Sequence, residues 1–291
     1  MNRFLEKIWI FSKDIKLEHS LFALPFAYLG LFMAEGKVPT LFLFVWITVA
    51  MVTFRTFAMC LNRLLDAPID IKNPRTKNRA LPSGKLTKPA VWTVAAVSLL
   101  IFELSAYKLK PLCFILTPVP IILAFIYPLM KRITWFSHFV LGSVLAIAPY
   151  GAWIASRGTF GVVPTLLSLG VVFWVAGFDM AYALQDVEFD RGEGLHSFPV
   201  AFGQDMTLAL TQILHLLSVI FWVFAGFLNG RGTIFFGGVF LAALFLNRSY
   251  HMIRSADLAK IDKIFFVMNA IVSISVFGAT VIDILWKGRV I

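Results

Sequence analysis

The chain has 291 residues, of which 59% are hydrophobic, 14% are charged and 30 are phenylalanine. A soluble domain is about 45–50% apolar and about 25% charged, so this composition excludes a soluble globule, a disordered chain and a nucleic-acid-binding module. The net charge of +10 is expected to come from basic loops on one side of a membrane. The two cysteines, Cys60 and Cys113, lie in apolar runs, which excludes a disulfide framework or thiolate metal site.

Membrane spans are the main structural signal along the chain. A span needs about 20 largely apolar residues, and six uncharged runs fit: 38–54, 111–130, 133–156, 158–178, 206–230 and 264–282. Three weaker runs are interpreted as further spans: 20–34, 89–107 and 232–247. We therefore predict an all-α, polytopic bundle of nine transmembrane helices, which forms a single domain over residues 1–291 within a lipid bilayer.

The basic residues predict the orientation of this bundle. Most of them lie in the leader 1–19 and in the connections 63–88 and 248–263, whereas few lie in the alternate connections. Because cytoplasmic loops carry the excess of Lys and Arg, we predict a cytoplasmic N-terminus and, after nine spans, an external C-terminus. The leader mixes apolar and charged positions, which indicates an interfacial helix or, alternatively, a plain solvated segment.

A first acidic motif follows the second predicted span, in an expected cytoplasmic active-site loop over 62–88. It combines polar residues at four-residue intervals with two later arginines: Asn62, Asp66, Asp70, Arg75 and Arg79. A second motif follows the sixth span, with a second active-site loop expected over 186–205. It contains Asp179, Tyr182, Asp186 and Asp190. Residues four apart share one face of a helix, so each motif is expected to present a narrow polar stripe.

Aspartates four apart on a helix repel each other, so two such pairs at corresponding ends of two spans need an explanation. Clustered carboxylates suit Mg²⁺, which binds one or two carboxylates together with substrate phosphate. Arg75, Lys77 and Arg79 lie beside the first pair, and arginine can bind two phosphate oxygens at once. We therefore predict a magnesium and diphosphate site; the alternative is two solvated helix faces.

These motifs resemble those of the UbiA superfamily of intramembrane prenyltransferases. The family's N-x-x-x-D-x-x-x-D motif matches at Asn62, Asp66 and Asp70, and its Y-x-x-x-D-x-x-x-D motif matches at Tyr182, Asp186 and Asp190. Its trailing R-T-x-N-R-x-L-P-x-G segment matches over 75–84. The resemblance covers nearly the whole chain, and the branch that it looks most like is the 4-hydroxybenzoate polyprenyltransferases and related menaquinone-pathway enzymes.

The resemblance implies Mg²⁺-dependent transfer of a polyprenyl group from polyprenyl diphosphate to the ring of an aromatic acid in quinone biosynthesis. It implies these metal-holding residues: Asn62, Asp66, Asp70, Asp186 and Asp190. It implies diphosphate binding by Asn62, Arg75, Arg79 and His196. Tyr182 would stabilise an allylic carbocation through its ring or bond the diphosphate. In a bacterium the enzyme would lie in the inner membrane, with its active site on the cytoplasmic side.

Two positions depart from the family's pattern or from regular helix chemistry. His196 stands where many members carry lysine in a G-x-K-S segment, and a histidine titrates near pH 6.5 unless perturbed. Pro68 lies inside the first motif, and proline removes an N–H and kinks or restarts a helix. We therefore expect Asp70 to lie on a new first turn.

The acceptor side is predicted from charges inside the spans. Arg55 lies about 10 Å deeper than the first motif on the same helix face, and an arginine within a span marks a functional site by default. We place the acceptor's carboxylate at Arg55 and add Asp179 and Lys16 to the acceptor side. The alternatives are an ion pair of Arg55 with Asp179 or Glu103, a diphosphate contact, or a structural role. His138 is interpreted as a structural hydrogen-bonding residue.

Other functions stay open at this point. A hydroxynaphthoate acceptor, terpenoid cyclisation or haem farnesylation would use the same diphosphate site. A transporter would ordinarily place its carboxylates near the membrane midplane, whereas these lie at the predicted ends of spans. A phosphatidyl-alcohol phosphotransferase is not favoured, because its D-G-x-x-A-R run is missing from the sequence.

Overall fold

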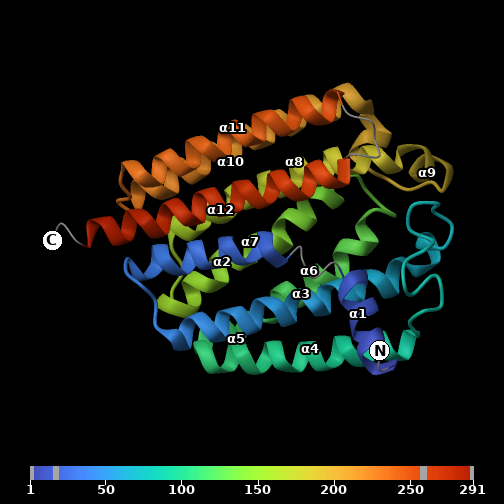
Figure 1. Cartoon of the computed structure of the whole chain (residues 1–291), viewed down its shortest axis with the longest axis horizontal. Coiled ribbons are helices and arrows are strands. Elements are labelled where there is room, and N and C mark those ends of the chain that lie inside the picture. The colour runs from blue at the N-terminus through green and yellow to red at the C-terminus, as the bar shows by residue number, and fades with distance from the viewer. Residues whose placement is uncertain (1–2, 16–19, 256–260, 289–291) are drawn as a thin grey trace.

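The computed structural model describes residues 3–15, 20–255 and 261–288, and every regular element within these ranges is a helix. Eight helices in the described part are long and apolar enough to cross a membrane, and a ninth apolar helix, Leu24–Glu35, is shorter. The predicted polytopic all-α bundle is confirmed. Figure 1 shows the long helices running side by side, with α1 at one end of the bundle and the C-terminus at the other.

The helices have the following bounds: α1 Arg3–Asp14, α2 Ser20–Glu35, α3 Leu41–Asp70, α4 Lys88–Leu109, α5 Pro111–Ile115, α6 Pro118–Met130, α7 Ser137–Arg157, α8 Val162–Tyr182, α9 Val187–Gly192, α10 Phe198–Leu228, α11 Thr233–Ser255 and α12 Ile261–Lys287. A short 3-10 helix, Ala183–Asp186, connects α8 to α9. Helices α5 and α6 together form one candidate span.

Local sequence chemistry determines where several helices begin and end. Thr40 and Thr87 precede α3 and α4, and each hydroxyl accepts a hydrogen bond of 3.4 Å from the backbone N–H three residues later, as N-cap residues do. Gly158 ends α7 with φ of 72°, a conformation that glycine adopts without a steric penalty.

Two expectations about the motif helices are wrong. Pro68 does not restart the helix, because α3 continues to Asp70 and the N–H of Ile71 still bonds to the carbonyl of Ala67. Pro68 lies in the last turn of α3, where its missing N–H removes one helical bond, to the carbonyl of Leu64, and leaves the final bonds of the helix in place. In the second motif, the 3-10 helix Ala183–Asp186 interrupts the expected stripe, so this motif does not follow one continuous α-helical face.

The apolar interior of the described residues contains four buried clusters, of which the two largest lie on different helices. One core joins α2, α8, α10, α11 and α12 around Phe26, Trp174 and Trp222, and the ring centroids of Phe26 and Trp174 lie 4.8 Å apart. The other core joins α3, α4 and α6 around residues such as Phe57 and Leu61. The space between these two cores contains the cavity described below.

Close packing of α2 on α7 depends on Gly30. A Cβ atom at this position would overlap the backbone of Pro149. We expect Gly30→Ala to destabilise the protein by about 1–3 kcal/mol, because an extra methyl group in a packed interior forces the backbone to shift. Thermal unfolding of the purified protein in detergent measures this effect as a lower unfolding temperature.

Gly278→Ala is the matched control, because a Cβ at Gly278 has no neighbour within 4 Å. We expect its unfolding temperature to equal or exceed that of the wild type, since alanine favours a helix more than glycine does. Equal behaviour of the two variants would contradict the close α2–α7 contact.

Candidate functional site

The two acidic motifs lie at the same end of the bundle (Figure 1). The first occupies the last turns of α3, and the second spans the end of α8, the 3-10 helix Ala183–Asp186 and α9. The loop after α3 therefore faces the segment after α8, although more than 100 residues separate them in the chain.

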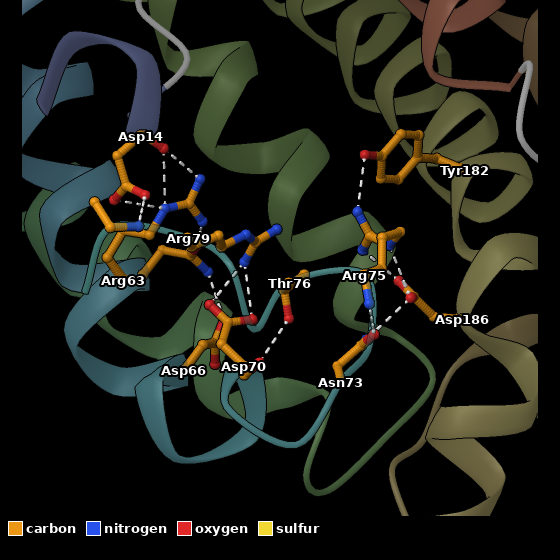
Figure 2. A network of polar contacts seen from close by, with 12 residues as sticks. Asp14, Arg63, Asp66, Asp70, Asn73, Arg75, Thr76, Arg79, Tyr182 and Asp186 are labelled. Atoms are coloured by element: carbon orange, nitrogen blue, oxygen red, sulfur yellow. Dashed lines mark hydrogen bonds and ion pairs between the residues drawn. The ribbon is translucent and has the colours of Figure 1, made fainter. Parts of the chain in front are cut away.

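Arg75 connects the two motifs directly. Its Nε and Nη2 atoms donate to the two carboxylate oxygens of Asp186 at 2.9 and 2.6 Å, and its Nη1 donates to the Tyr182 hydroxyl at 3.2 Å. The side-chain amide of Asn73 also donates to Asp186, at 3.1 Å. Figure 2 shows this bridge beside the loop that carries both donors. A bidentate arginine–carboxylate pair is directional as well as strong, so it holds the two motifs in a defined relative position.

The first motif has its own hydrogen bonds. Nη1 of Arg79 donates to both carboxylate oxygens of Asp70, at 2.8 and 2.7 Å. The Thr76 hydroxyl donates to the Asp70 backbone carbonyl at 3.0 Å, which ties the loop to the end of α3. The amide of Asn62 donates to a carboxylate oxygen of Asp66 at 2.7 Å, as expected for residues four apart on one helix face.

Lys131 is a site residue that sequence reasoning missed. Its Nζ lies 2.8 Å from Oδ2 of Asp190, whose side chain is fully buried. The backbone N–H of His196 donates to the Lys131 carbonyl at 2.7 Å, while the His196 side chain is exposed. The sequence offered one signal: Lys131 and Arg132 directly follow an apolar span at the same predicted membrane face as both motifs.

Arg63 is a second missed residue, and it joins α1 to the first motif. Its Nη2 and Nε donate to the Asp14 carbonyl at 2.7 and 3.1 Å, and Nε lies 3.4 Å from an Asp14 carboxylate oxygen. Its Nη1 donates to Oδ1 of Asn62 at 3.1 Å. The other Asp14 carboxylate oxygen accepts from the N–H of Ala80. Both charged side chains are 5% exposed, so this buried pair positions Asn62 as well as α1.

A cavity of about 570 Å³ begins at these residues and continues between the two cores. Its polar end is lined by predicted site residues: Arg55, Asn62, Arg79, Asp179 and Tyr182. The rest of its wall is mostly apolar and comes from α3, α4, α5, α6 and α7. The cavity therefore joins a cationic, hydrogen-bonding mouth to an apolar interior.

The acceptor-side predictions have mixed outcomes. Arg55 and Asp179 both line the cavity. Asp179 bonds to Nδ1 of His138 at 2.7 Å, and Glu103 accepts from the Thr117 hydroxyl at 3.0 Å. Arg55 donates to the Ile15 carbonyl at 3.3 Å. Lys16 lies outside the described residues.

His138 has a hydrogen-bonding role, as expected, and it acts on a cavity residue. Its Nε2 accepts from the backbone N–H of Phe198 at 3.3 Å. Because Nε2 is an acceptor, the neutral ring carries its proton on Nδ1 and donates it to Asp179. The Asp179 carboxylate is therefore held in place at the cavity wall.

The predicted metal ligands do not form a ready-made cage. Within the described ranges, no group of three or more His, Cys, Asp or Glu side chains could hold a metal ion. The carboxylates instead lie on the two motif segments, and three of them have a neighbouring Arg or Lys. This donor set fits Mg²⁺, which takes one or two carboxylates and completes its shell with water and substrate phosphate.

Comparison with known proteins agrees with this geometry. The model of the UbiA prenyltransferase family matches residues 23–271. A 4-hydroxybenzoate octaprenyltransferase of Nitrosomonas eutropha is 28% identical over 256 residues, which are 88% of this chain and 89% of that protein.

Solved structures share the same fold. The apo structure of a UbiA homolog from Aeropyrum pernix K1 superposes with a TM-score of 0.83 at 30% identity, covering 92% of this chain and 98% of that one. A UbiA homolog from Archaeoglobus fulgidus bound to GPP and Mg²⁺ has a TM-score of 0.71 at 19% identity, covering 93% and 99%. The arrangement of helices described above is thus the arrangement found in this family.

The buried Arg63–Asp14 pair leads to a stability prediction. Asp14→Asn or Arg63→Met alone leaves one buried charge without its partner, which costs about 3–5 kcal/mol. The double variant removes both charges, so we expect it to be more stable than either single variant. Thermal unfolding in detergent measures all four proteins as a double-mutant cycle.

Lys72→Ala is the control, because the Lys72 side chain is 59% exposed in its ion pair with Glu193. Exposed pairs contribute at most about 1 kcal/mol, so this variant should unfold near the wild-type temperature. Additive single-variant effects in the cycle would contradict a direct Arg63–Asp14 interaction.

Proposed function

This chain belongs to the UbiA prenyltransferase family, and from that premise we propose the reaction that it catalyses. It transfers a polyprenyl group from polyprenyl diphosphate to the ring of an aromatic acid of the 4-hydroxybenzoate type, with release of diphosphate, in quinone biosynthesis. The observation that carries this proposal is the single cavity that joins a cationic mouth to an apolar interior. Such a cavity suits a donor with an anionic head and a hydrocarbon tail.

The diphosphate binds at the mouth, where Arg79 lines the cavity and where Arg75 and Lys131 pair with the carboxylates of the second motif. Each of these cations now pairs with a motif carboxylate at 2.6–2.8 Å, so each is already directed toward the space between the motifs. Bound Mg²⁺ would neutralise negative charge on the leaving diphosphate. The residues that would hold it are Asn62, Asp66, Asp70, Asp186 and Asp190.

His196 has a smaller part in this proposal than Lys131. The His196 side chain is exposed, whereas the Lys131 ammonium lies 2.8 Å from a carboxylate oxygen of Asp190. Lys131 therefore supplies the positive charge for which His196 had been a candidate, and it does so from the end of α6.

Tyr182 lies between the proposed diphosphate site and the part of the cavity where the reacting carbon would lie. Its hydroxyl accepts from Arg75, and its ring lies 4.8 Å from the ring of Phe265 by centroids. Tyr182, Phe178 and Phe265 all line the cavity. As the allylic C–O bond breaks, positive charge develops on carbon, and aromatic ring faces next to the mouth stabilise such charge.

The aromatic acid binds at the polar part of the cavity wall, between Arg55 and Asp179. Arg55 binds the carboxylate of the acid, and Asp179, held by His138, accepts the hydrogen bond of the phenol. Diphosphate leaves as the allylic C–O bond breaks, the new C–C bond forms between the allylic carbon and the ring, and the ring carbon passes its proton to the released diphosphate or to water. We place this chemistry on the cytoplasmic side of a bacterial inner membrane, where basic loops are expected.

Loss of a motif carboxylate tests the metal and diphosphate site. We expect Asp66→Asn and Asp186→Asn to lower prenyl transfer by about a hundredfold or more, because electrostatic stabilisation of a leaving group is a large catalytic contribution. The measurement uses purified protein, Mg²⁺, a radiolabelled polyprenyl diphosphate and 4-hydroxybenzoate, with an EDTA control. Thermal unfolding checks that each variant is folded.

Asp205→Asn is the matched control, because Asp205 is an exposed carboxylate on α10, outside both motifs. Wild-type turnover by the two motif variants would contradict the proposed site. A product with dihydroxynaphthoate alone would indicate the menaquinone reaction. Diphosphate release without any acid would indicate cyclisation.

Arg55→Gln tests the acceptor position. A hydrogen bond to a charged group contributes about 1.5–3 kcal/mol, so we expect the KM for 4-hydroxybenzoate to rise about tenfold. The KM for unsubstituted phenol should stay close to its wild-type value, because phenol has no carboxylate for Arg55 to bind. Equal changes for both acceptors, or none, would show that Arg55 does not bind the carboxylate.

A further inference from the structure

The cavity is long as well as apolar. On α3 its lining runs from Asn62 back to Ile47, and on α7 it runs from Leu141 to Ala155. At a rise of 1.5 Å per residue, both distances are about 20 Å. A ligand whose head lies at the mouth therefore has a deep apolar channel ahead of it.

Gly151 lies in the deep half of this channel. It is on α7, about 20 Å further along the helix axis than His138, which bonds to Asp179 at the polar end. Leu109, Cys113 and Phe160 also line the cavity. A side chain at position 151 would project into open space at a wall that is mostly apolar.

Neither backbone geometry nor packing explains a glycine at position 151. It lies inside α7 and is not among the positive-φ glycines. Gly30, Gly142 and Gly170 allow close contacts that a Cβ atom would prevent, whereas a Cβ at Gly151 would meet nothing within 4 Å. Gly237 and Gly278 have equally open space, but only Gly151 of these three lines the cavity. Glycine also stabilises a helix less than alanine does. What glycine provides at position 151 is therefore the open space that a side chain would fill.

We propose that Gly151 determines the length of isoprenoid chain that the cavity accepts, by keeping its deep half open. This inference rests on the proposed function, because the chain concerned is the tail of the prenyl diphosphate donor. A geranyl tail, with two isoprene units, ends before Gly151. Geranylgeranyl and longer tails reach or pass it, so only long donors depend on the missing side chain.

The occupant is expected to be a linear hydrocarbon tail. The lining beyond the polar end is mostly apolar and includes Leu109, Ala155 and Phe160, so a polar ligand would find few hydrogen-bonding partners there. Burying a polar group without hydrogen bonds is unfavourable, whereas each methylene moved from water into such a channel is favoured.

The test is a donor series with three variants, Gly151→Ala, Gly151→Leu and Gly151→Phe. Each is assayed with geranyl, farnesyl, geranylgeranyl and octaprenyl diphosphate and 4-hydroxybenzoate. For Gly151→Phe we expect kcat/KM with octaprenyl diphosphate to fall at least about tenfold relative to geranyl diphosphate, because hydrophobic sites discriminate by such factors when a group no longer fits. The leucine and alanine variants should give smaller, graded losses, and alanine keeps the test valid if phenylalanine prevents folding.

Gly237→Phe is the matched control, because Gly237 is exposed on α11, does not line the cavity and also has no neighbour within 4 Å of a Cβ. Its donor preference should equal that of the wild type. A wild-type octaprenyl-to-geranyl ratio in all three Gly151 variants would overturn the proposal.

A binding experiment separates this inference from the proposed reaction. Geranylgeraniol and geraniol are added to the metal-free protein, and ligand binding is measured as a rise in unfolding temperature. We expect Gly151→Phe to lose the stabilisation by geranylgeraniol and to keep that by geraniol. If geranylgeraniol stabilised the wild type but not Gly151→Phe, and the wild type transferred no prenyl group, the proposed function would fail and the role of Gly151 would stand. If both alcohols stabilised wild type and variant equally, the role of Gly151 would fail alone.

Discussion

A carboxylate that leaves water needs a cation or several hydrogen-bond donors around it, and this requirement organises the functional end of the bundle. Asp70, Asp186 and Asp190 are buried, and each has a cation within 2.8 Å. The cations come from other elements: the loop after α3 supplies two arginines, and the end of α6 supplies a lysine. Ion pairing therefore holds α3, α6 and the α8–α9 segment together where apolar packing ends.

The same arrangement explains why the cavity has two unlike ends. Apolar side chains pack into two cores, one around Trp174 and Trp222 and the other around Phe57 and Leu61. The channel lies between these cores. The charged cluster lies at one end of the bundle, next to the polar end of the channel. An amphiphilic ligand fits both parts. Ionic contacts at the charged end compensate for the water that its head loses, and the apolar channel removes its tail from water.

The sequence was sufficient for the fold and for the composition of the motifs, because both depend on local pattern. Span length follows from hydropathy, and the spacing of Asn62 and Asp66 places them on one helix face, where they do bond to each other. Arg55 and Asn62 also line one cavity, as their shared face predicted.

The remaining features depend on contacts between distant segments. Arg63 follows Asn62 directly but bonds to Asp14, 49 residues earlier, and His138 bonds to Asp179, 41 residues later. Periodicity cannot indicate such partners. The 3-10 helix at Ala183–Asp186 was likewise unpredictable from spacing, because it positions Asp186 beside Arg75 through tertiary contacts. The continuation of α3 past Pro68 reflects how near that residue lies to the helix end, a boundary that sequence pattern defines poorly.

The ion pairs also bear on how the proposed substrates bind. Arg75, Arg79 and Lys131 neutralise three carboxylates in the structure, so a divalent cation alone would be placed next to three positive charges. A diphosphate alone would be placed next to the carboxylates. If both bound, the cations would pair with phosphate and the carboxylates would hold the metal, so each charged group would keep a partner of opposite sign. Each ligand would then reduce the repulsion that opposes the other, and by thermodynamic linkage the favourable coupling would be equal in both directions. A site built from paired charges, rather than from a preformed metal cage, would thus favour the metal–diphosphate complex over either component alone.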